Sequence, residues 1–145
     1  MDSRKEICDR FNSLHWHDSK LLGVAVRETG GGEYDVRLQL DLFTDTPEGL
    51  RLTSTELRFS EARVLQLDLD ILGITYCGGD IGTASCEADS EVKTRLEGQL
   101  RENFDLPQPD PPLSQLCEFH IRMIHPGGML RIFAKDFALL TGASA

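Results

Sequence analysis

The sequence predicts an α+β fold that is mostly β, with about seven strands in an antiparallel sheet, a sandwich or an open barrel, and one covering helix. Apolar and polar residues alternate with period two over most of the chain, whereas helical spacing is clear only over residues 90–103. No βαβ alternation is present, which argues against a nucleotide-binding parallel sheet. The 145 residues fit a single domain, residues 1–145.

A hairpin is expected over residues 21–42. The glycines of the segment TGGGE suit a turn that needs positive φ. Before this turn the alternating apolar residues are Leu22, Val24 and Val26. After it, one face of the second strand carries Tyr34, Val36, Leu38, Leu40 and Leu42, while the other face is polar.

Two more strands follow a polar turn that contains Pro47 and Gly49. Leu57 and Phe59 alternate with polar residues in STELRFS. The alternating apolar residues of VLQLDLDIL are Leu65, Leu67, Leu69 and Ile71. The outer face of that strand carries Gln66, Asp68 and Asp70. Residues 74–77, ITYC, have the composition of a further short strand that ends at two glycines.

Helical spacing predicts one amphipathic helix over residues 90–103. Asp89 or Ser90 can cap the free amides of its first turn, and the prolines of LPQPDPPL prevent its continuation. The apolar face of this helix consists of Val92, Leu96 and Leu100. A short N-terminal helix within KEICDRFNSL is a second possibility, and it buries Ile7, Phe11 and Leu14.

A final hairpin surrounds the segment HPGG, in which Pro126 and Gly127 suit the central positions of a type II turn. The apolar residues alternate as Phe119, Ile121 and Met123 before the turn and as Leu130, Ile132 and Ala134 after it. Phe137 and Leu139 then reverse the parity of the alternation, so we expect a bulge at Lys135–Asp136.

The composition restricts the class of partner. The net charge is −9, and no cluster of Lys and Arg is present to contact phosphates, so a nucleic acid is not expected. An acidic surface favours a basic partner. No apolar run reaches the roughly 20 residues of a membrane helix, and MDSRKEICDRF has no apolar segment for a signal peptide, so a cytoplasmic location is expected.

The segment HWHD is a candidate metal site. If the strand begins this early, His15 and His17 share a face with Cα atoms about 6.5–7 Å apart, from which both can reach one zinc or other divalent ion. His120 is the candidate further ligand, and Asp18 joins the site only if the backbone turns there. The alternative is structural: Trp16 anchors the core and Asp18 organises the entrance to the strand.

Other catalytic patterns are weak. The four cysteines are widely spaced and form no CxxC pair, so small core residues or free thiols are expected at Cys8, Cys77, Cys86 and Cys117. Asp68 and Asp70 share a strand face at a spacing that suits acid and base roles, but in a protein this acidic a solvated face is the simpler interpretation.

Two segments resemble parts of small bacterial β-rich families, some of which are described as immunity proteins of toxin systems. The first is Trp16-His17-Asp18, followed by Leu21, Leu22 and a glycine-rich hairpin. The second is the closing CEFHIRMIHPGGMLRIFAKDFALL. This resemblance implies a non-enzymatic cytoplasmic domain, and it assigns no catalytic residue.

Taken together, these patterns favour a non-catalytic binding protein for a basic partner, with Trp16, Asp18, Asp41, Asp68 and Asp70 as candidate binding residues. No cofactor is expected in this interpretation. One rival is a small metal-dependent enzyme that uses His15 and His17. Another is a small-ligand carrier, if the sheet closes around a cavity. A monomer and a homodimer both remain open, because periodicity does not show which strand edge is free.

Overall fold

The computed structural model of the chain describes residues 3–69, 79–104, 112–124 and 128–141. The strand expected at residues 74–77, the HPGG turn at Pro126 and Gly127, and Asp70 lie outside these residues. Within the described ranges, no helix has the length and apolar character needed to cross a membrane.

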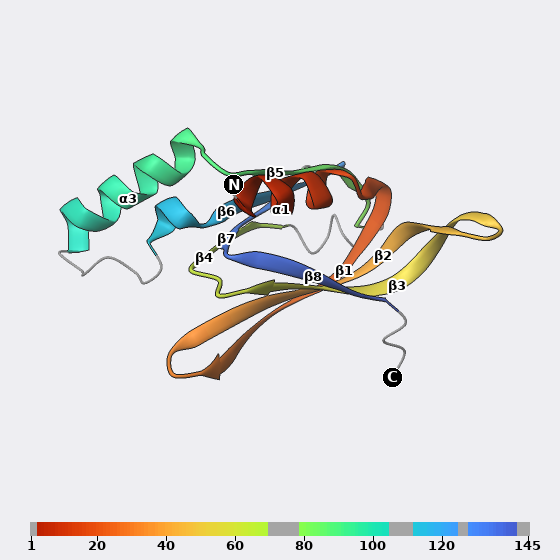
Figure 1. Ribbon diagram of the computed structural model, residues 1–145, viewed down its shortest axis with the longest axis horizontal. Helices are drawn as coiled ribbons and strands as arrows, with labels where there is room; N and C mark the ends of the chain where they lie inside the picture. Colours follow the sequence, from red (N-terminus) through yellow and green to blue (C-terminus); the bar gives the residue numbers. More distant parts are fainter. Residues whose placement is uncertain (1–2, 70–78, 105–111, 125–127, 142–145) are drawn as a thin grey trace.

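Two four-stranded antiparallel sheets form the body of the protein (Figure 1). Sheet A has the order β1-β2-β3-β8, and sheet B has the order β4-β7-β6-β5. Sheet A contains β1 (His15–Gly30), β2 (Glu33–Thr46), β3 (Gly49–Ser60) and β8 (Asp136–Thr141). Sheet B contains β4 (Val64–Asp68), β5 (Ile81–Glu87), β6 (Cys117–Met123) and β7 (Met129–Ala134). The helical segments are α1 (Ser3–Asn12), α3 (Glu91–Phe104) and the 3₁₀ helix η1 (Leu113–Gln115). This confirms the mostly β, antiparallel prediction, and both sheets are open.

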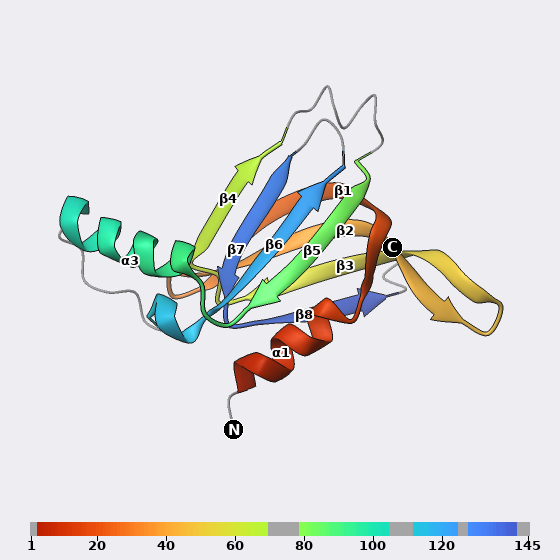
Figure 2. The same cartoon turned by 90° about the horizontal axis from the view of Figure 1, so that it is seen from above.

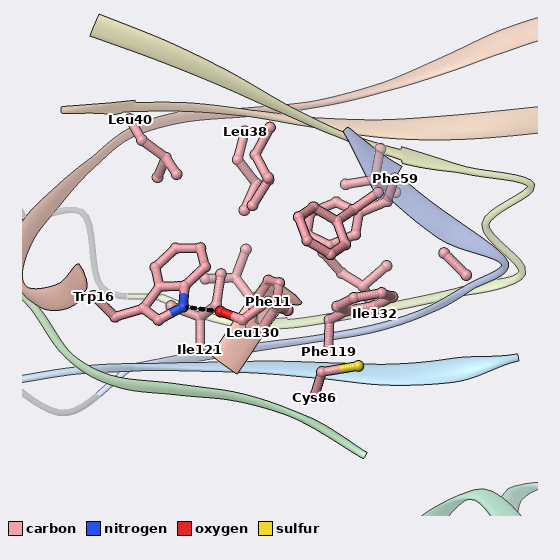
Figure 3. Packing of buried hydrophobic residues seen from close by; sticks show 14 of the residues in the cluster. Phe11, Trp16, Leu38, Leu40, Phe59, Cys86, Phe119, Ile121, Leu130 and Ile132 are labelled. Atoms are coloured by element: carbon pink, nitrogen blue, oxygen red, sulfur yellow. Dashed lines mark hydrogen bonds between the residues drawn. The ribbon is translucent and has the colours of Figure 1, made fainter. Parts of the chain in front are cut away.

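The main core lies between the two sheets. Figure 3 shows side chains of both sheets pointing toward one another: Leu38, Leu40 and Phe59 from sheet A, and Phe119, Ile121, Leu130 and Ile132 from sheet B. Each of these side chains is at most 1% exposed. The alternation therefore assigned the inner faces of β2, β3, β6 and β7 correctly, except that Tyr34 at the start of β2 is 45% exposed. Leu67 differs from the prediction, because it lies on the edge strand β4 and is 48% exposed.

The start of β1 is bent by a bulge at Asp18. This residue has φ +65°, and the pairing of β1 with β2 shifts register between His15 and Lys20. Ser19 is fully buried there: its Oγ donates to the His15 carbonyl at 2.7 Å and accepts from the Phe43 amide at 3.1 Å. The backbone turn that the sequence allowed at Asp18 is therefore present.

Beyond the bulge, Val24 of β1 packs against the core as predicted, but Leu22 and Val26 do not. Leu21 is 3% exposed, whereas Leu22 is 59% exposed, because a second register shift lies between Leu21 and Gly23. Val26 is 55% exposed where the hairpin extends beyond the core. The prediction that Leu22 and Val26 are core residues is wrong.

The parity change after β7 has another cause than the expected bulge. β7 pairs with β4 and β6, whereas β8, which begins at Asp136, pairs with β3 in the other sheet. The chain therefore changes sheets at Lys135, whose amide donates to the Ser60 carbonyl at 3.0 Å. The bulge predicted at Lys135–Asp136 is wrong, because a change of sheet also reverses which residues face the core.

Strand β5 was not predicted. Its sequence, IGTASCE, has few large apolar residues, and a register shift between Ile81 and Thr83 moves the inward positions from odd to even numbers. Ile81 and Cys86 are buried, and Ala84 packs against the core. No constant period of two remains, which explains why the pattern was missed.

Both helices were predicted. In α1, Phe11 is buried between the sheets, and Figure 2 shows this helix beside β5 and β8. In α3, the Lys93 amide donates to Ser90 Oγ at 3.1 Å, so Ser90 is the N-cap. Val92 and Leu96 of α3 pack against a small second core formed by Leu113, Leu116 and Phe133. Both residues belong to the first half of α3, and the helix extends away from the sheets (Figure 1).

Candidate functional site

The HWHD stretch forms one wall of a surface pocket with a volume of about 500 Å³. The pocket lies where the start of β1 meets the β2–β3 hairpin and β5. It is lined by Asn12, Leu14, His15, Trp16, His17, Phe43, Leu50, Thr83 and Ala84.

Trp16 is the rigid part of this wall. It is 5% exposed, its ring centroid lies 4.6 Å from that of Phe11, and its Nε1 donates to the Phe11 carbonyl at 2.8 Å. The indole therefore anchors β1 to α1 and to the core, as the structural interpretation of HWHD expects.

His15 and His17 both lie at the surface beside carboxylates. His15 Nε2 is 3.5 Å from Asp45 Oδ2, and His17 Nδ1 is 3.1 Å from Asp18 Oδ2. The His15 and His17 side chains are 47% and 73% exposed. Each histidine thus has its own acidic neighbour.

His120 lies on the outer face of sheet B, opposite Arg131 on β7 and Ser85 on β5. Among the described residues, the cluster that brings three or more potential metal-ligand side chains within reach consists of cysteines, not of histidines. The structure therefore does not bring His120 together with His15 and His17.

Burial lowers the pKa of His120, and the charges of Arg131 and Arg122 lower it further, against the opposing effect of Glu118 and Glu87. An unfolded histidine titrates near pH 6.5. Below about pH 6.5, His120 binds a proton more readily in the unfolded chain than in the folded chain. The free energy of unfolding should therefore fall as the pH falls. Urea unfolding should show that the free energy of unfolding falls less between pH 7 and pH 5 in His120→Gln than in the unaltered protein. Equal losses would contradict this origin of the pH dependence.

The predicted acidic residues do not form one face. Asp41 lies on the outer face of sheet A, opposite Lys20 on β1, and Asp68 lies on the outer face of sheet B. Elsewhere on sheet A, acidic and basic side chains neutralise one another. These ion pairs are Arg37–Asp35 at 3.2 Å, Arg37–Glu56 at 3.9 Å and Arg58–Glu56 at 2.9 Å.

The pocket continues into an exposed apolar surface. Leu50 and Leu52 of β3 are 49% and 44% exposed, and Leu52 pairs with Phe43 across the β2–β3 ladder. Asp45 and Asp18 flank this surface with side chains that are 84% and 60% exposed. We call the surface formed by His15, His17, Asp18, Phe43, Asp45, Leu50 and Leu52 the HWHD face.

A larger groove, of about 1000 Å³, runs along α1. Four of its charged side chains form two ion pairs within the protein. Arg10 Nη2 lies 2.7 Å from Asp136 Oδ1, and Lys135 Nζ lies 3.4 Å from Glu61 Oε2. These pairs leave less uncompensated charge for a ligand than the exposed carboxylates of the HWHD face provide.

Three cysteines from different elements form a second site. Cys8 of α1, Cys86 of β5 and Cys117 of β6 are all buried, and their Sγ atoms lie within 4.8 Å of one another. Cys8 Sγ and Cys86 Sγ are 2.8 Å apart. Cys117 Sγ also lies 3.8 Å from the carbonyl oxygen of Arg4. We call this group the thiol cluster.

The three thiols of the cluster differ in acidity. Burial raises the pKa of Cys8 to about 11. The hydrogen bond to Cys117 and burial raise the pKa of Cys86. The hydrogen bond from Cys86 lowers the pKa of Cys117 against the effect of burial, and the positive charges of Lys93 and Arg4 lower it further. Cys117 is therefore the thiol that loses its proton first.

The sequence had no signal for this cluster. Its members are separated by dozens of residues, and no local spacing joins them. α1 and the pairing of β5 with β6 bring the three cysteines together, and β5 was itself missed. The HWHD pocket was easier to anticipate, because three of its candidate residues, His15, Trp16 and His17, are adjacent in the sequence.

No protein-family model matches the chain, and no curated protein matches it.

Proposed function

We propose that this protein is a non-catalytic binding protein whose HWHD face docks a basic protein. The observation that carries the proposal is the half-exposed leucine pair, Leu50 and Leu52, beside a pocket flanked by the exposed carboxylates of Asp18 and Asp45. Apolar side chains within a charged rim are typical of surfaces that associate with another protein.

Charge supports a basic partner. The net charge of −9 attracts a cationic protein over long range, and Asp18 and Asp45 provide local complementarity at the rim. Trp16 and the Asp18 bulge hold the histidine wall in place, so little ordering of the backbone is needed on binding. A basic bacterial toxin, bound as an immunity protein binds its target, is the partner that the sequence resemblance suggests.

The test compares two substitutions of leucines that are equally exposed. Leu50→Asp changes the HWHD face, whereas Leu67→Asp changes a residue of sheet B that is 48% exposed against 49% for Leu50. Proteins cross-linked to each variant in cells are identified by mass spectrometry, and the affinity of the captured protein is measured. We expect Leu50→Asp to weaken binding about 30-fold or more and Leu67→Asp to leave it within about twofold.

Association kinetics test the role of charge. The association rate of the captured partner should fall about tenfold between about 50 and 300 mM salt. An acidic partner, or a rate that does not depend on salt, would contradict the electrostatic argument. Equal effects of Leu50→Asp and Leu67→Asp would place the interface elsewhere.

A further inference from the structure

We propose that Cys8, Cys86 and Cys117 together bind one copper(I) ion through three thiolate sulfurs. This site is separate from the HWHD face, and it does not depend on the proposed partner.

The geometry of the thiol cluster suits one metal ion. Three sulfurs that surround an ion at about 2.3 Å stand about 4 Å apart. The three Sγ atoms already lie within 4.8 Å of one another, and the Cys8–Cys86 sulfur pair needs to open from 2.8 Å. Cys8 is on a helix and the other two are on neighbouring strands, so a small shift of α1 provides this change.

The number and burial of the ligands favour copper(I) over zinc. Protein zinc sites are almost always four-coordinate, with a fourth side chain or an open water position. Among the described residues no further Cys, His, Asp or Glu joins the cluster, and the exposures of Cys8, Cys86 and Cys117 are 7%, 4% and 0%, which excludes bulk water. Copper(I) is soft and accepts three thiolates without a fourth ligand.

Two cations beside the cluster offset part of the charge of such a complex, and one of them, Arg4, is also paired with Asp89 at 3.3 Å. Three thiolates and one copper(I) carry a net charge of two minus. Lys93 is 4% exposed, and its Nζ donates to the carbonyls of Leu116 at 2.8 Å, Ser114 at 3.5 Å and Ala88. A buried ammonium bonded to carbonyl oxygens favours a nearby anion. Arg4 Nη1 donates to the same two carbonyls of Ala88 and Ser114, which places a second positive charge next to the first.

Binding releases the protons of all three thiols to solvent as three Cu–S bonds form, and no atom is oxidised or reduced. A disulfide between Cys8 and Cys86 is the competing outcome. It would join two sulfurs that are 2.8 Å apart, lose two hydrogens to an oxidant and leave the Cys117 thiol outside the bond.

The experiment uses the full chain, purified without oxygen, in a Cys77→Ser background. This background removes the fourth cysteine of the chain, so any thiolate ligands must come from the cluster. Copper(I) is titrated in competition with bathocuproine disulfonate, and X-ray absorption defines the ligands. We expect one copper(I) per chain, with three sulfur neighbours at about 2.3 Å and no nitrogen or oxygen neighbour. The unaltered chain should bind copper(I) with the same affinity as the Cys77→Ser variant.

Single ligand substitutions complete the test. Cys8→Ser and Cys117→Ser should each weaken copper(I) binding at least about 100-fold, while circular dichroism reports whether each variant stays folded. Cys8 lies on α1 and not on a strand, so its substitution disturbs the sheets least. The proposal is overturned by loss of binding in the Cys77→Ser background, by nitrogen ligands, by full affinity in Cys8→Ser, or by a Cys8–Cys86 disulfide that forms in protein purified without oxygen. None of these measurements involves a partner protein. A negative result would therefore contradict copper(I) binding but not the docking function proposed for the HWHD face.

Discussion

Replacing Phe11 by alanine is expected to lower the free energy of unfolding by about 3–5 kcal/mol. Phe11 is fully buried at the point where α1 meets both sheets. Its ring centroid lies 5.0 Å from that of Phe119 and 5.3 Å from that of Phe137, in addition to the contact with Trp16. These rings belong to both sheets, so the rigid surroundings cannot collapse into the cavity that the substitution creates.

Urea unfolding, followed by the fluorescence of the single tryptophan, measures this effect. The matched control is Leu22→Ala, since Leu22 is also apolar but 59% exposed, and we expect its effect to stay within about 0.5 kcal/mol. A loss below about 1.5 kcal/mol for Phe11→Ala would mean that α1 contributes little to the core. The same substitution should also loosen the packing of Cys8, which lies one helical turn before Phe11.

Replacing Arg131 by methionine is expected to lower the free energy of unfolding by about 2–4 kcal/mol at neutral pH. Arg131 Nε donates to Glu118 Oε1 at 2.9 Å, and its Nη1 donates to Gln66 Oε1 at 3.1 Å. The Glu118 side chain is only 7% exposed. Within the described part of the chain its other carboxylate oxygen has no hydrogen-bond partner. The substitution leaves a buried carboxylate without its cation, and this penalty exceeds the lost attraction itself.

A double substitution separates these two contributions. Glu118→Gln combined with Arg131→Met removes both charges, and we expect it to recover at least half of the stability lost in Arg131→Met. Thermal and urea unfolding of both single variants and the double variant give the coupling energy. Additive effects would show that Arg131 acts by packing rather than through Glu118.

Much of the sheet could be predicted because each residue of a strand faces the side opposite to its neighbour. Val36, Leu38, Leu40 and Leu42 alternate without interruption, and all four are buried. The helix at 90–103 was predicted equally well, because its spacing and its Ser90 cap are local features.

The errors lie where a strand bends, ends or changes sheet. Bulges in β1 and β5 move the inward positions by one residue, so Leu22 points outward and Cys86 points inward. At Lys135 the chain leaves one sheet for the other. An edge position exposes Leu67 despite its correct parity. None of these features changes the local composition enough for the sequence pattern to predict it.

The sequence by itself determined the class of fold, most of the strands and the α3 helix, because these depend on periodicity and on capping by neighbouring residues. It also drew attention to HWHD, in which a lone tryptophan stands beside polar residues. Only the tertiary structure decided which side chains from distant parts of the sequence lie close together. It separated His120 from His15 and His17, divided Asp41 and Asp68 between opposite faces, and assembled Cys8, Cys86 and Cys117 in one buried cluster. Such contacts depend on strand order and on helix placement, which are set by packing of the whole core and leave no trace in local spacing.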